Sequence, residues 1–143
     1  MRTILIVEDS DDDFLAISRV FNHAGLRNPL QRCSNGDLAL DYLYRRGEFL
    51  QAEAPGLLLL DLNLPGTDGR QVLRAIKADP ALQQIPVIVL TTSFEGEDVR
   101  RCYEAGADSY LFKPVDMAGF LNSIARLKEN WRGGNDLDLP GLQ

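Results

Sequence analysis

Short apolar runs alternate with amphipathic segments along the chain. The runs have the length of strands, and three of them are nearly continuous in apolar residues, which is typical of strands buried on both faces. The segments between them carry apolar residues three and four positions apart, the spacing of one helix face. We expect strands at 3–7, 29–33, 57–60, 86–90 and 109–112, and helices at 11–25, 35–46, 68–78, 95–105 and 116–131.

This strict alternation predicts an α/β doubly wound fold, a five-stranded parallel sheet with helices on both faces. Right-handed crossovers between parallel strands leave few topologies open. In sheets of this kind ligands bind beyond the carboxyl ends of the strands, at the point where the strand order reverses. The residues that directly follow each predicted strand are therefore the first candidates for function.

Length and composition indicate one domain. The chain has 143 residues, and its composition shifts after Trp131 to Gly, Asn, Asp and Pro, so we expect a domain at 1–131 and a tail with little structure at 132–143. No apolar run approaches the ~20 residues that cross a bilayer, and the apolar start is too short for a signal peptide. We therefore expect no membrane contact and a cytoplasmic location.

The charge balance narrows the function classes. Acidic residues outnumber basic ones by 21 to 15, and no run of Lys and Arg exceeds two, so we expect no nucleic-acid binding. The single histidine, His23, lies in a predicted helix, so a metal site or catalytic dyad built on histidine is disfavoured. Cys33 and Cys102 have no CxxC spacing, and we expect free, space-filling thiols.

Acidic, hydroxyl and basic residues follow four of the five predicted strands. Glu8 and Asp9 follow the first strand, and Asp61, Thr91 and Lys113 follow the third, fourth and fifth. Because parallel strands bring these positions to one edge, three carboxylates would repel one another there. A divalent cation is the natural relief, and an oxygen ligand set without His or Cys suits Mg²⁺ better than Zn²⁺.

This group has the parts of a phosphoacceptor. A carboxylate beside Mg²⁺ and a lysine can attack phosphorus and hold an acyl phosphate. Asp61 is the best nucleophile because its strand, 57–60, is predicted to be central. Mg²⁺ and Lys113 would offset the charge of the phosphoryl oxygens, and Thr91 can donate a hydrogen bond to them. The turn-rich loop 62–69 offers carbonyl groups to the metal.

Two other classes of protein match parts of this pattern. A Mg²⁺-dependent phosphatase or hydrolase also uses an aspartate nucleophile, but it normally places a second acid two residues later, where this chain has Asn63. A flavodoxin-like cofactor binder needs a Ser-, Thr- or Gly-rich loop after the first strand, where this chain is acidic. The pattern favours a switch that catalyses only its own phosphorylation and dephosphorylation.

Simpler interpretations hold for some neighbours. The acids 11–13 fit the N-terminus of a helix, where negative charge is favourable. Thr92 competes with Thr91, but side chains alternate along a strand, so only one of the two faces the site. Tyr110 is an aromatic residue in a strand, and such a side chain usually belongs to the core.

Four motifs together resemble the receiver domain of two-component response regulators. They are Glu8-Asp9, LDLNLPGTDG at 60–69, the threonines after PVIVL, and YLFKP at 110–114. The resemblance covers roughly residues 2–130. It implies a flavodoxin-like (βα)₅ fold with strand order 2-1-3-4-5, and a phosphoryl group accepted on Asp61 from a histidine kinase in a Mg²⁺-dependent reaction.

The resemblance also implies roles for individual residues. Asp9, Asp61 and the carbonyl of Asn63 would bind Mg²⁺, and Glu8 would act through water. Lys113 would bind the phosphate. It further implies that Thr91 and Tyr110 form the switch pair, and that the peptide before Pro114 is cis.

A finer resemblance is to single-domain regulators that partner phytochrome kinases. It rests on the helix end at 42–47 and the extended loop before Leu57. It implies a bacteriophytochrome as the kinase and a homodimer through the 95–131 face. The mixed charges of helix 95–105 could pair across a two-fold axis. Alternatively, they pair three and four positions apart within one exposed helix.

Overall fold

A computed structural model describes residues 2–93 and 95–128. The predicted tail at 132–143 and the last residues of the predicted helix 116–131 lie outside the described residues. The strands are β1 (Ile4–Val7), β2 (Leu30–Cys33), β3 (Leu57–Asp61), β4 (Val87–Thr91) and β5 (Ser109–Phe112). The helices are α1 (Asp11–Ala24), α2 (Gly36–Leu43), the 3₁₀ helix η1 (Gly47–Phe49), α3 (Gly69–Ala78), α4 (Gly96–Glu104) and α5 (Met117–Lys128).

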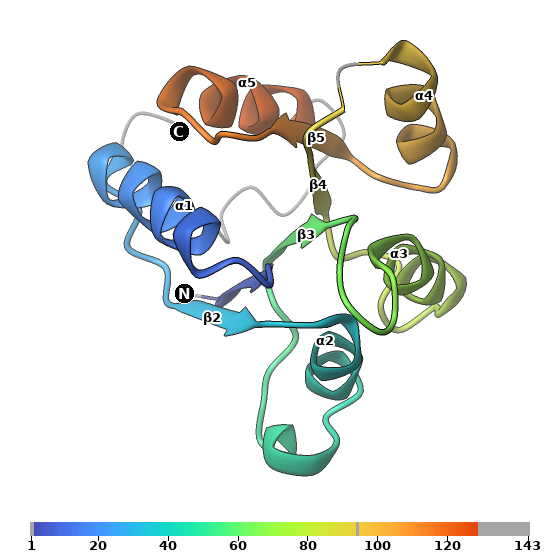
Figure 1. The fold of residues 1–143 in the computed structure, drawn as a ribbon. Helices are drawn as coiled ribbons and strands as arrows, with labels where there is room; N and C mark the ends of the chain where they lie inside the picture. The colour runs from blue at the N-terminus through green and yellow to red at the C-terminus, as the bar shows by residue number, and fades with distance from the viewer. Residues whose placement is uncertain (1, 94, 129–143) are drawn as a thin grey trace.

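The strands form one parallel sheet in the order β2-β1-β3-β4-β5. Helices α1 and α5 cover one face, and α2 and α3 lie on the other (Figure 1). The predicted fold class and strand order are confirmed. The order reverses between β1 and β3, so the carboxyl ends of these strands border the switch point where ligands bind in doubly wound folds.

The apolar side chains of the sheet divide between two cores. Along β3, Leu57 and Leu59 face α1 and α5, while Leu58 and Leu60 face the other helices. All four leucines are fully buried. Burying one such side chain stabilises the fold by about 1.5–3 kcal/mol. The central strand that ends in Asp61 is therefore a firm support for the residues at its carboxyl end.

Local signals place the helix ends. The Ser10 hydroxyl accepts a hydrogen bond from the Asp13 amide, and α1 ends at Gly25 in the left-handed conformation. Asp68 and Gln71 form a capping box at the start of α3. The predicted end of the second helix at residue 46 is wrong: α2 ends at Leu43 because Arg45 takes a positive φ of 56°.

Among the residues that the structure describes, no helix has both the length and the hydropathy that crossing a membrane requires.

Candidate functional site

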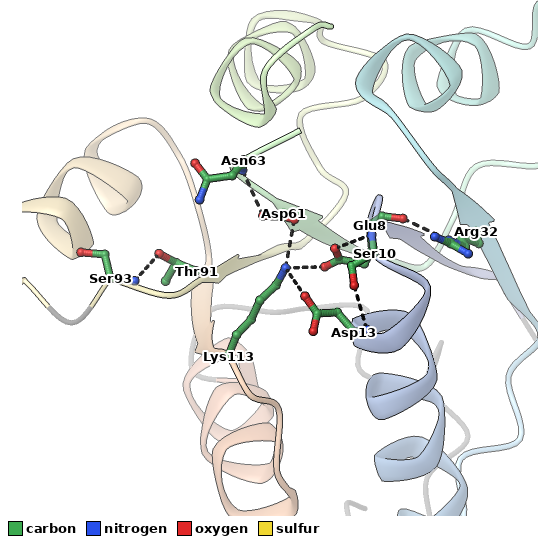
Figure 2. A network of polar contacts seen from close by, with 9 residues as sticks. All are labelled: Glu8, Ser10, Asp13, Arg32, Asp61, Asn63, Thr91, Ser93 and Lys113. Atoms are coloured by element: carbon green, nitrogen blue, oxygen red, sulfur yellow. Dashed lines mark hydrogen bonds and ion pairs between the residues drawn. The ribbon is translucent and has the colours of Figure 1, made fainter. Parts of the chain in front are cut away.

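The carboxyl edge of the sheet brings the predicted lysine and two of the predicted acids together (Figure 2). The Lys113 ammonium lies 2.6 Å from Oε2 of Glu8 and 3.0 Å from Oδ2 of Asp61. All three side chains are nearly buried, with exposed fractions of 11% for Lys113, 0% for Glu8 and 4% for Asp61. The Lys113–Pro114 peptide is cis, as the resemblance implied.

A fourth member of this cluster was not identified from the sequence as a site residue. Asp13 Oδ2 lies 3.1 Å from the Lys113 ammonium. Its assignment to the first turn of a helix is confirmed, since Asp11, Asp12 and Asp13 all lie there. The first turn of a helix that follows a strand also lies at the carboxyl edge of the sheet. An acid at this place could therefore have been considered for the cluster.

Burial and pairing set the ionisation of the cluster. Loss of solvent raises the pKa of Glu8 to about 7, although the hydrogen bonds from Lys113 and the Ser10 amide oppose this rise. Burial alone would lower the pKa of Lys113, but its bonds to Glu8 and Asp61 outweigh burial and raise that pKa. The lysine is therefore a fixed positive charge, and the carboxylates around it outnumber it.

The backbone around Asp61 holds its carboxylate in place. Oδ1 accepts a hydrogen bond of 3.0 Å from the Asn63 amide, while Oδ2 faces Lys113. The start of α3 packs so closely against the end of β3 that a Cβ at Gly69 would lie 2.2 Å from the Asp61 carbonyl oxygen. Only glycine fits this contact without movement of the strand end. The side chain of Asn63 is exposed.

The two predicted switch residues lie in different surroundings. Thr91 is buried, its hydroxyl accepts a hydrogen bond of 3.0 Å from the Ser93 amide, and Thr92 is exposed. The two threonines thus take opposite sides, as strand alternation predicts. Tyr110 is half-buried on β5, with its ring centroid 4.8 Å from that of Phe112 and the Arg126 guanidinium carbon 4.4 Å from it.

The acidic side chains have the composition of a site for a hard divalent cation. Carboxylate oxygens of Glu8, Asp9 and Asp61 all lie within 4.8 Å of one another. Oxygen ligands of this kind suit Mg²⁺, Mn²⁺ or Ca²⁺. The two cysteines are free and buried elsewhere, as predicted, and burial raises the pKa of Cys33 to about 12. The acidic cluster therefore fits a cation that prefers oxygen.

Comparisons with known proteins agree with this geometry. A scan of protein families matches residues 4–125 to the response regulator receiver domain. The probable methanogenesis regulatory protein FilR2 of Methanothrix harundinacea is 40% identical over 92% of this chain and 84% of its own length. Response regulator Rcp1 of Synechocystis is 37% identical over 91% of this chain and 88% of its own length.

Solved structures give the same result. The Mn²⁺-bound form of Rcp1 aligns with 92% of this chain and 94% of its own, with a TM-score of 0.76 and 37% identity. The bacteriophytochrome response regulator AtBRR aligns with 92% of this chain and 95% of its own, with a TM-score of 0.83 and 36% identity. By its sequence, its strand order and the acidic edge of its sheet, the chain belongs to the receiver domain family of two-component response regulators.

Proposed function

We propose that Asp61 accepts a phosphoryl group from the phosphohistidine of a histidine kinase. The observation that carries this proposal is the ammonium of Lys113, 3.0 Å from the Asp61 carboxylate in a nearly buried cluster. An oxygen of Asp61 forms a bond to phosphorus while the P–N bond breaks. The bonding electron pair stays with the imidazole, which takes up a proton from solvent. Lys113 offsets the charge on the phosphoryl oxygens.

The same proposal assigns the cation site to Mg²⁺. Asp9, Asp61 and the backbone carbonyl of Asn63 would hold it directly, and Glu8 would act through water. The close approach of the three carboxylates and the Mn²⁺-bound form of the relative Rcp1 support this assignment. When bound, Mg²⁺ supplies positive charge to the transferring phosphoryl group. The single positive charge of Lys113 does not balance the carboxylates around it, and a divalent cation would offset the remaining negative charge.

Thr91 and Tyr110 are proposed as the switch pair. The Thr91 hydroxyl, which accepts a hydrogen bond from the Ser93 amide, would donate one to a phosphoryl oxygen. In the sheet Thr91 pairs with Phe112, whose ring packs against that of Tyr110. Phe112 therefore links Thr91 to Tyr110, by strand pairing on one side and by ring packing on the other. The phosphoryl group would act by favouring one of two conformations of Thr91, Phe112 and Tyr110.

The proposed kinase is a phytochrome-type histidine kinase, since AtBRR, a bacteriophytochrome response regulator, matches this chain over 95% of its own length. We further propose a cytoplasmic location, a chemistry limited to the domain's own phosphorylation and dephosphorylation, and a homodimer through the 95–131 face. The exposed Tyr103 and Leu121 on α4 and α5 support such an interface. The charges of α4, however, pair within the helix, where Arg100 contacts Glu97 and Glu104.

The substitution Asp61→Asn tests the phosphoacceptor. Asparagine keeps the shape of the side chain but has no nucleophilic carboxylate, so we expect labelling by acetyl phosphate in Mg²⁺ to be abolished. Intact mass spectrometry measures the label, and Asp12→Asn, the same change at an exposed site, serves as the matched control. Undiminished labelling of Asp61→Asn would place the acceptor elsewhere. A purified phytochrome-type kinase as donor tests the partner in the same assay.

A further inference from the structure

Arg32 connects three parts of the chain beside the acidic cluster. It lies in β2 opposite Ile6 of β1. Its Nε donates a hydrogen bond of 3.0 Å to the backbone carbonyl of Glu8, and its Nη1 lies 2.6 Å from Oδ1 of Asp11. The guanidinium carbon is 5.1 Å from the centroid of the Phe14 ring. One side chain thus ties the end of β1 to the first turn of α1.

The carbonyl held by Arg32 belongs to the peptide that joins Glu8 to Asp9. The Glu8 amide donates a hydrogen bond of 3.1 Å to the Cys33 carbonyl of β2. The backbone is therefore anchored to β2 on both sides of the Glu8 side chain. Because a peptide unit is planar, fixing its carbonyl also fixes the direction in which the backbone enters Asp9.

Asp9 depends on this backbone support. Its side chain is exposed, and within residues 2–93 and 95–128 no hydrogen bond or ion pair holds its carboxylate. By contrast, Lys113 contacts both Glu8 and Asp61. The Asp9 carboxylate nevertheless lies close enough to theirs to share a cation. Its placement therefore comes from the backbone, which Arg32 holds before Asp9 and which the hydrogen bond from the Ser10 amide to Glu8 Oε1 holds after it.

We propose that Arg32 is a positioning residue for the cation site, acting through the Glu8–Asp9 peptide. This inference rests on the proposed function, because it takes Asp9 as a direct ligand. Arg32 and Lys113 lie on opposite sides of Glu8 (Figure 2), so the guanidinium is not part of the carboxylate cluster. Coulomb repulsion alone would make an arginine here weaken cation binding. If Arg32 instead positions Asp9, the arginine strengthens cation binding and its removal weakens it.

The test measures Mg²⁺ affinity by calorimetry in Arg32→Met, Arg32→Lys and the matched control Arg19→Met. Methionine keeps an apolar stem against Phe14 but has no donors. We expect Arg32→Met to weaken Mg²⁺ binding about tenfold, as loss of a residue that orients a metal ligand does. The Mg²⁺ affinity of Arg32→Lys should lie between those of Arg32→Met and the wild type, since an ammonium cannot replace the planar guanidinium with its several donors. Arg19, exposed on α1, should have no effect.

A second readout separates positioning from general stability. The rate of phosphorylation by acetyl phosphate should return to the wild-type value in Arg32→Met once Mg²⁺ is saturating. Unchanged or tighter Mg²⁺ binding in Arg32→Met, with or without a lower thermal midpoint, overturns the inference. If Arg32→Met does not fold, unchanged or tighter Mg²⁺ binding in Arg32→Lys overturns the inference instead. A wild-type chain that binds no Mg²⁺ would instead refute the proposed function.

Discussion

Two groups of charged side chains in this molecule each pair one basic residue with several acidic ones, but the two groups differ in burial. In the cluster around Lys113, its own side chain is 11% exposed, and those of Glu8 and Asp61 are 0% and 4% exposed. On α4, Arg100, Glu97 and Glu104 are 48–60% exposed. An exposed pair contributes about 0.2–1 kcal/mol, whereas a buried group carries a large desolvation cost unless it is paired. Burial therefore distinguishes the proposed phosphoacceptor group from the surface pairs of α4.

The two groups also differ in how their partners meet. On α4 the spacing along one helix suffices, because Glu97 and Glu104 lie three and four positions from Arg100. In the buried cluster, Lys113 is 52 positions from Asp61 and 100 from Asp13. Only the topology of the sheet brings these groups together. The helix surface is thus a local feature, and the site is a property of the whole domain.

Substitution of Lys113 by alanine should have the largest effect on this comparison. The variant leaves the buried carboxylates without their cation, and we expect a loss of about 3 kcal/mol in the free energy of unfolding. Urea denaturation measures it, and Mg²⁺ should restore more stability to this variant than it adds to the wild type. Arg74→Ala, at an exposed position, is the control. A loss below about 0.5 kcal/mol would equate the cluster with an exposed pair.

The two acids after β1 should respond differently to alanine. Asp9→Ala should weaken Mg²⁺ binding at least about tenfold, because it removes a proposed ligand. The free energy of unfolding should change little, because the Asp9 side chain is exposed and pairs with no other side chain among the described residues. Glu8→Ala should weaken binding less but change stability more, since Glu8 is buried against Lys113. Calorimetry and denaturation on the same samples compare the two. The reverse order of Mg²⁺ affinities would reject the assignment of Asp9.

Changing both Arg100 and Arg101 to Glu should have the smallest effect on folding. It breaks exposed pairs within α4, so the free energy of unfolding should fall by no more than about 1 kcal/mol. The same variant tests the proposed dimer. Sedimentation of the wild type should give about twice the 15.9 kDa of one chain, and the variant should sediment as a smaller species. A wild-type monomer at every concentration, phosphorylated or not, would remove the dimer.

The sequence was sufficient for features that depend on local pattern. Periodicity placed every strand, and position after a strand identified Glu8, Asp61 and Lys113, which the structure brings together. The contact of Asp13 with Lys113 was not predicted, because the expectation covered only the residues that directly follow a strand. Asp13 lies one step further along the chain, in the first turn of α1.

Helix boundaries were the other weakness of the sequence reasoning. The early end of α2 follows from the backbone angle of Arg45, and its side chain carries no signal for a left-handed conformation. The 3₁₀ helix η1 was likewise not predicted. Its turn lies where the apolar periodicity of α2 has already ended. Such short elements depend on packing that a periodic pattern does not describe.

The distance along the chain between Lys113 and its partners has a consequence for folding. We expect contacts that join positions 52 and 100 apart to form late in folding, since the entropy of closing such loops opposes them until the sheet assembles. The cluster around Lys113 is then complete only in the complete domain, and a cation that binds beside it stabilises the folded domain as a whole. During synthesis, a nascent chain that ends before β5 has emerged lacks the lysine and cannot yet assemble the buried charged cluster.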